Sequence, residues 1–511
     1  MNRKTVLIGL DGATWKIIHP LVSEGKLPHM KRLMDEGTHG ILMSDEKMVS
    51  PSVWTTILTG QVPQKHGILD FMTMQNKLKS KRLWNIYEDH GMSIGISGFL
   101  MTWPPRVKNH GFMIPDHFAP DNQTIPDDVS FLRELTNTRH LKQNLSPAKM
   151  MEFYSKSRKN NIDFASLIKA FRVFLEKRSS RSTYLDTFHK EINIFMLFLE
   201  RVFTTLVKSY KPDLAAIYLA GTDVLAHKYW HFFKPEDFED VDKAMIRKFG
   251  NVIPDVYIAS DRIIGRILKA YDAMYGDYDV VVVSDHGFQT YHDRKFRPSV
   301  KIEYVLNKTG MNERFNYTKV GHMAIVTPKA DSAELEQKYL KELEGKLAKI
   351  QFVKDNTAVL ETDITENYMK ISAQPYWKGY KFDDDIVING ESGKVDNVID
   401  KGVLITGTHE REGIIIAAGK NIKRGFELEG GEVYDVTPTM LAMQGLPIAK
   451  DMDGKVLEAI FKDGFLEDQP LQYTDTYGAP EGLGFTEKES EAVKENEEIL
   501  ISKLRSLGYM E

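Results

Sequence analysis

The sequence of 511 residues contains no cysteine. Disulfide bonds and thiolate metal sites are therefore excluded, and any bound metal must have oxygen and nitrogen ligands. Neither sign of charge dominates, because 67 Lys and Arg residues stand against 72 Asp and Glu residues, for a formal net charge of -5. This balance gives no reason to expect nucleic acid as a partner. The basic stretch at 156–159 fits a solvated helix face better than a phosphate-binding patch.

Long apolar runs are also missing. The N-terminal run ends at Asp11, too early for the apolar region of a signal peptide, and predicts the first core strand instead. The most apolar later stretch, at 192–203, is interrupted by polar residues and is far too short to cross a bilayer. We therefore expect no transmembrane segment and, by default, a cytoplasmic location. The sequence does not indicate an oligomeric state.

The order of strand-like and helix-like stretches predicts the architecture. Apolar strand runs alternate with helical patterns through most of the chain, which predicts an α/β fold with a mostly parallel sheet flanked by helices. Two blocks interrupt this pattern, the first rich in helix-forming Lys, Arg, Leu and Phe. The predicted parts are a core at 1–120, 208–300 and 401–465, a helical cap insertion at 121–207, a second insertion at 301–400, and a C-terminal tail and helix at 466–511.

What the sequence does contain is a set of Asp and His residues that follow apolar runs. Asp11 closes the run at 5–10, and Asp285 and His286 come just after four consecutive valines. Ligands of open α/β sheets gather at the carboxyl ends of the strands, so we expect these side chains to meet there. Two ionisable residues at the end of a buried strand are costly unless they are paired or bind metal.

Asp223 and His227 follow the apolar run at 214–219 with a spacing of four. On a helical turn this spacing places both on one side, which suits chelation of zinc or manganese. The alternative is a surface Asp beside a buried histidine with ordinary hydrogen bonds. His409 follows the apolar run at 403–405 in a polar segment, and taken alone it is typical of a surface loop histidine.

Ser50 precedes Pro51 at the start of a predicted helix. One interpretation is a helix N-cap followed by proline in the first turn. The other is a nucleophile at the positive end of the helix dipole, where a phosphoryl group is stabilised. Three further histidines are expected to be structural or to support the site, with the last a possible substrate contact: His66, His231 and His292.

Taken together, these residues resemble the alkaline phosphatase superfamily, in its type I phosphodiesterase/nucleotide pyrophosphatase branch. The matching segments occur in the family order and are Gly9-Leu10-Asp11-Gly12, Ser50-Pro51-Ser52-Val53-Trp54-Thr55, Pro63-Gln64-Lys65-His66-Gly67, Asp223 with His227, Ser284-Asp285-His286-Gly287, Gly407-Thr408-His409 and Asp435-Val436-Thr437-Pro438-Thr439. The resemblance implies an alkaline-phosphatase-like sandwich. Neither of the two predicted insertions contains a segment that matches the family.

The resemblance further implies two divalent metal ions, usually zinc, with manganese as an alternative. One ion is expected at Asp223, His227 and His409. The other is expected at Asp11, Asp285 and His286, with Ser50 bridging toward it as the nucleophile. The implied reaction is hydrolysis of a phosphodiester or pyrophosphate bond in a small-molecule substrate through phospho-Ser50.

Two departures from related families bear on specificity. Nucleotide pyrophosphatases place an Asn shortly after the nucleophile, where this chain has Val53, so nucleotide specificity is not implied. Sulfatases require Pro and Arg at positions held here by Ser52 and Trp54, which argues against sulfatase activity. The alternatives are a phosphomonoesterase, phosphomutase or phosphotransferase of the same superfamily, and a binding protein that has kept the fold without catalysis.

Overall fold

The computed structural model describes residues 3–133, 147–179, 182–238, 241–291, 296–320, 323–330, 332–365, 368–373, 383–404 and 406–495. The chain divides into two compact units. The first runs to Thr290 and resumes at Gly407, and the second is Tyr291–Thr406. The predicted second insertion at 301–400 falls within the second unit.

The first unit is built on an eight-stranded sheet in the order β19-β2-β18-β6-β1-β5-β3-β4. Its strands are β1 (Lys4–Leu10), β2 (Thr38–Met43), β3 (Ile94–Ser97), β4 (Gly111–Ile114), β5 (Leu214–Leu219), β6 (Tyr278–Val283), β18 (Glu412–Ala418) and β19 (Phe426–Glu432). Only β18 runs antiparallel to its neighbours β2 and β6 within this sheet. The predicted α/β fold with a mostly parallel central sheet is therefore confirmed.

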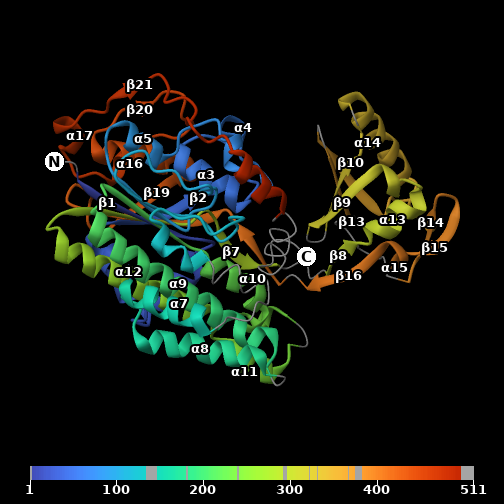
Figure 1. The fold of residues 1–511 in the computed structure, drawn as a ribbon, viewed down its shortest axis with the longest axis horizontal. Helices are drawn as coiled ribbons and strands as arrows, with labels where there is room; N and C mark the ends of the chain where they lie inside the picture. The colour runs from blue at the N-terminus through green and yellow to red at the C-terminus, as the bar shows by residue number, and fades with distance from the viewer. Residues whose placement is uncertain are drawn as a thin grey trace. The chain divides into compact units, whose positions relative to one another are not determined.

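Helices cover both faces of this sheet, as Figure 1 shows. On one side lie α9 (Tyr184–Tyr210), α10 (Gly221–Phe233) and α12 (Val252–Met274), and on the other lie α3 (Ser50–Thr59), α5 (Leu83–Asp89) and α16 (Val436–Gln444). Other described helices of this unit are α1 (Trp15–Ser23), α2 (Pro28–Glu36), α4 (Pro63–His66), α7 (Pro147–Lys159), α8 (Phe164–Arg178), α11 (Lys243–Phe249) and α17 (Phe465–Asp468). The predicted final helix, 487–507, is helical at 487–495, and its remainder lies outside the described residues.

The three central strands β1, β5 and β6 are buried along nearly their whole length and mostly apolar, because both sheet faces are covered. Their register pairs Leu10 with Leu219 and Gly9 with Val283, so the carboxyl ends of all three strands lie at one edge. Gly9 is required for this packing, since a Cβ there would lie 2.7 Å from the Trp54 ring of α3. The edge where these strands end carries the residues discussed below.

The second unit has a hydrophobic core of its own. It contains a four-stranded antiparallel sheet, a three-stranded antiparallel sheet and a two-stranded pair. The sheet strands are β9 (Phe315–Val320), β10 (Met323–Pro328), β12 (Leu360–Ile364) and β13 (Met369–Ala373), then β11 (Gln351–Phe352), β14 (Asp385–Ile388) and β15 (Glu391–Lys394), then β8 (Phe296–Val300) and β16 (Ile399–Leu404). Its helices are α13 (Ile302–Thr309), α14 (Ala333–Leu347) and α15 (Val395–Val398).

One strand prediction is wrong. The apolar run at 403–405 does not add a strand to the central sheet. Residues 403 and 404 end β16, which pairs antiparallel with β8 in the second unit, and residue 405 lies outside the described residues. His409 lies instead in a short strand, β17 (Gly407–Glu410), which pairs antiparallel with β7 (Gly287–Thr290) directly after His286. This ladder, not a strand end, brings His409 to the edge of the sheet.

Candidate metal centre

Asp11, Asp285 and His286, here called the inner cluster, lie at the carboxyl ends of the two adjacent strands β1 and β6. Their ligand atoms are all within 4.8 Å of one another, and all three residues are buried. His286 Nε2 is 3.3 Å from Asp285 Oδ2 and 3.6 Å from Asp11 Oδ1. The ends of the two strands therefore bring two carboxylates and one imidazole close together.

Each residue of the inner cluster has one side-chain atom that is held by a hydrogen bond to a neighbouring residue. Tyr218 of β5 donates its hydroxyl to Asp11 Oδ2, and the backbone N–H of Gly12 donates to Asp285 Oδ1 at 3.2 Å. His286 Nδ1 is 3.0 Å from the carbonyl oxygen of Gly287, so Nδ1 carries the proton and Nε2 has a lone pair. Within the described residues, Asp11 Oδ1, Asp285 Oδ2 and His286 Nε2 are buried without a hydrogen-bond partner.

The buried carboxylates of the inner cluster favour the binding of a cation. Burial, together with the charges of Asp285 and Asp223, raises the pKa of Asp11 well above its ordinary value. Burial and the charge of Asp223 raise the pKa of Asp285 to about 7. Burial lowers the pKa of His286, which keeps this imidazole neutral. In their ionised form these two buried carboxylates are stabilised by a positive charge among them, and without one the raised pKa of each favours the protonated form.

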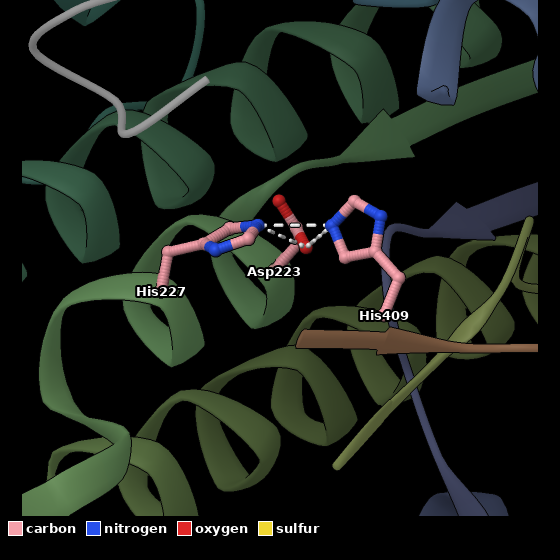
Figure 2. Close-up of side chains that lie close together, drawn as sticks. All are labelled: Asp223, His227 and His409. Carbon is pink, nitrogen blue, oxygen red and sulfur yellow. Dashed lines mark hydrogen bonds and ion pairs between the residues drawn. The ribbon is translucent and has the colours of Figure 1, made fainter. Parts of the chain in front are cut away.

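Asp223, His227 and His409, here called the outer cluster, form the second group (Figure 2). Asp223 and His227 lie one turn apart on α10, and His409 approaches from β17 on the opposite side. The Nε2 atoms of the two histidines are 2.9 Å apart, and Asp223 Oδ1 is 3.3 Å from His227 Nε2 and 3.2 Å from His409 Nε2. The helical spacing predicted for Asp223 and His227 is confirmed.

Charge is distributed differently in the outer cluster. Although burial opposes ionisation of Asp223, the two histidines outweigh it and hold the pKa of this carboxyl well below its usual range. Burial lowers the pKa of His227. Burial also opposes protonation of His409, but its hydrogen bond with Asp223 raises the pKa of His409 overall. His409 Nδ1 lies 2.9 Å from the carbonyl oxygen of Met48, which orients the ring with Nε2 toward Asp223.

The two clusters are adjacent. The imidazole rings of His286 and His409 stack with centroids 3.7 Å apart and an interplanar angle of 21°. Asp223 also contributes to the electrostatic environment of both Asp11 and Asp285. The six side chains therefore form one continuous polar centre.

Both triads fit a metal ion in donor type and spacing. A tetrahedral ion with bonds of about 2.0–2.1 Å holds its ligand atoms about 3.3 Å apart. The outer donors, at 2.9–3.3 Å, match three corners of such a site. Carboxylate oxygen and imidazole nitrogen suit zinc, and the carboxylate-rich inner cluster also suits manganese. The buried atoms without a hydrogen-bond partner in the inner cluster are the ones that an ion would contact.

Ser50 is the first residue of α3, and Val49 holds the N-cap position. The alternative interpretation of Ser50 as an ordinary N-cap is therefore not supported. Its hydroxyl is buried and has no hydrogen-bond partner among the described residues. The hydrogen bond between His409 and the Met48 carbonyl ties the segment entering α3 to the outer cluster.

Two of the three weaker histidine candidates are among the described residues, and neither belongs to a cluster. His66 is buried, with Nε2 3.0 Å from Thr56 Oγ1 and Nδ1 accepting from the Ile68 N–H at 3.1 Å, which confirms a structural role. His231 contacts Phe232 on α10. His292 lies outside the described residues. Sequence reasoning missed Tyr218 because a tyrosine inside an apolar strand carries no signal beyond that of a core residue.

Comparison with known proteins identifies the family. The sequence model described as type I phosphodiesterase / nucleotide pyrophosphatase matches residues 5–410. The chain belongs to this family. It is accordingly a hydrolase that acts on phosphoric ester bonds, and its family is metal-dependent.

Solved structures of similar proteins include human ectonucleotide pyrophosphatase/phosphodiesterase 5, at 14% identity and a TM-score of 0.47, covering 91% of this chain and 99% of that chain. The murine protein of the same name is 13% identical with a TM-score of 0.43, covering 87% of this chain and 95% of that chain. No curated protein matches the chain.

Proposed function

We propose that this hydrolase cleaves a phosphodiester or pyrophosphate bond of a small molecule through a phosphorylated Ser50, with one divalent ion in each cluster. Zinc is the first choice for both ions and manganese the second. The observation that carries the proposal is the buried Ser50 hydroxyl, which caps no helix and has no hydrogen-bond partner among the described residues. A buried hydroxyl without a partner is costly in a structural role.

The position of Ser50 supports a role in attack on a phosphoryl group. It opens α3, a helix of 10 residues whose positive dipole end favours a phosphate. In the first step the Oγ–phosphorus bond forms while the bond to the leaving alcohol or phosphate oxygen breaks. The serine hydroxyl gives its proton to solvent, and the leaving oxygen takes up a proton from solvent. In the second step a water molecule attacks phospho-Ser50, releases phosphate or its monoester, and returns a proton to Oγ.

The six cluster residues would hold the ions that support this chemistry. When bound, two such ions stabilise charge on the attacking and leaving oxygens and lower the pKa of a neighbouring hydroxyl. The hydrogen bonds to His286 and His409 keep Nε2 available as the ligand atom in each ring. Val53 is buried in α3 and its side chain has no polar atom to offer a phosphoryl oxygen, so the proposal does not include nucleotide specificity.

The decisive experiment compares Ser50→Ala with Ser52→Ala, because both serines are buried in the first turn of α3. Hydrolysis of bis-p-nitrophenyl phosphate and p-nitrophenyl phosphate is measured together with metal content. Ser50→Ala should lower kcat by at least about 10³-fold with its metal content intact, while Ser52→Ala stays within about tenfold of wild type. Near-normal turnover by Ser50→Ala would remove Ser50 from the mechanism. Faster cleavage of the monoester would favour a phosphomonoesterase, and transfer to an added alcohol would favour a transferase.

A further inference from the structure

One face of helix α8 (Phe164–Arg178) exposes a line of large apolar side chains. Phe164, Ile168, Phe171 and Leu175 are 59%, 36%, 47% and 51% exposed. Their spacing of four, three and four residues places them along one side of the helix. Scattered apolar residues are ordinary on a protein surface, but a continuous line on one helix marks an interaction site.

This line is separate from the face that holds α8 in the fold. Ser166 and Val173 are buried on the other side of the helix, where α8 packs against α9. Figure 1 shows α8 on the side of α9 that faces away from the sheet. The fold therefore accounts for one face of α8 and leaves the apolar line at the surface.

The sequence segment that contains this line is rich in basic residues. Residues 147–178 include eight Lys and Arg against three Asp and Glu, although the whole chain has a net charge of -5. Each of the three acids is paired: Glu152 with Lys156, Asp163 with Arg201, and Glu176 with Lys190.

Two of the exposed basic residues lie beside the apolar line. Lys169 and Arg172 follow Ile168 and Phe171 directly in the helix, and neither forms an ion pair within the part of the chain that the structure describes. An apolar line with basic residues beside it is the pattern of a helix that lies in a membrane interface.

We propose that α8 docks on an anionic lipid bilayer, lying in the plane of the surface with Phe164, Ile168, Phe171 and Leu175 among the headgroups and Lys169 and Arg172 toward anionic lipids. Charge favours this partner over a second copy of the chain, because a symmetric dimer across this face brings like charges together. Among the described residues no helix is long and apolar enough to cross a membrane.

The test is flotation of the full-length chain with vesicles of phosphatidylcholine alone and of phosphatidylcholine with phosphatidylserine at a ratio of 70:30. Wild type should float with the anionic vesicles only. Lys169→Gln/Arg172→Gln should weaken this binding about 30-fold, because each basic residue near an anionic surface contributes about a factor of 5. Phe164→Ser/Phe171→Ser should weaken it by at least about tenfold.

Matched controls remove exposed residues of the same type elsewhere. Lys420→Gln/Arg424→Gln deletes two exposed basic residues, and Tyr473→Ser deletes an aromatic residue that is 58% exposed. Both should bind like wild type. The proposal fails if wild type does not float with the anionic vesicles, or if the α8 variants bind as wild type does. It also fails if sedimentation velocity shows a wild-type dimer that Phe164→Ser/Phe171→Ser converts to monomer, because that result makes this face a contact between copies.

Discussion

The inner and outer clusters are built from the same residue types but differ in support and in charge. The inner cluster has two carboxylates and one imidazole, all fully buried at the ends of β1 and β6. The outer cluster has one carboxylate and two imidazoles, and both of its histidines are 18% exposed. Its third member, His409, comes from a strand of four residues that pairs only with β7 among the described strands.

This difference predicts two distinct roles for a bound ion. In the inner cluster the two buried carboxylates repel each other, so a bound cation would offset this repulsion. In the outer cluster Asp223 is already balanced by its two histidines, so the ligands hold their geometry without help. We therefore expect the inner site to bind more tightly and the outer site to exchange more readily.

The largest effect is expected from Asp285→Asn. This change removes a charged ligand from the inner cluster, so the purified variant should lose one ion and at least about 10³-fold in turnover. The measurement is metal analysis with diesterase kinetics. Asp261→Asn is the control, because Asp261 is a buried Asp outside both clusters that accepts from the Met30 N–H at 2.8 Å. Full metal occupancy in Asp285→Asn would show that the inner cluster is not assigned correctly.

In the absence of metal, Asp285→Asn should be more stable than the wild type. Burial and the neighbouring charge of Asp223 raise the pKa of Asp285 to about 7 in the folded protein. The folded state therefore binds a proton more strongly than the unfolded state, and the metal-free wild type should lose stability as the pH rises from about 4 to about 7. Asp285→Asn escapes this loss, so its advantage should be absent near pH 4 and reach on the order of 4 kcal/mol at pH 8. Denaturant unfolding in chelator measures both proteins, and a constant difference across this range would contradict the charge argument.

His409→Ala should have a smaller and partly reversible effect. Asp223 and His227 remain one turn apart on α10, so two of the three outer ligands stay in place. The outer ion should bind at least about 10²-fold more weakly, and excess zinc should restore part of the activity. Calorimetric titration of the metal-free protein checks this, with His231→Ala as the control from the same helix. If both ions are lost together, the two sites are not independent.

A residue of this centre is predictable from the sequence when a local pattern positions it, and not when long-range pairing does. Asp11, Asp285 and His286 extend apolar strands, and Asp223 with His227 follows a helical spacing, so local pattern was enough. His409 was singled out because it follows the apolar run at 403–405, but its position depends on a ladder between segments more than 100 residues apart, which local pattern does not predict. The sequence also could not show that the Ser50 hydroxyl makes no capping hydrogen bond. The pattern of a helix start does not tell whether the serine or the preceding Val49 occupies the N-cap.

Tyr218→Phe should give the smallest effect and tests the support of the inner cluster alone. Removing its hydroxyl frees Asp11 Oδ2 but leaves the three ligands present, so inner-site affinity should fall about 10-fold while the outer site is unchanged. Tyr257→Phe is the matched control, because this buried tyrosine accepts from the Thr14 N–H at 3.2 Å and contacts no cluster residue in a described hydrogen bond. A selective loss at the inner site would show that its geometry depends on a neighbouring strand as well as on its own. An equal loss at both sites would mean that Tyr218 supports the whole strand edge and does not position Asp11 alone.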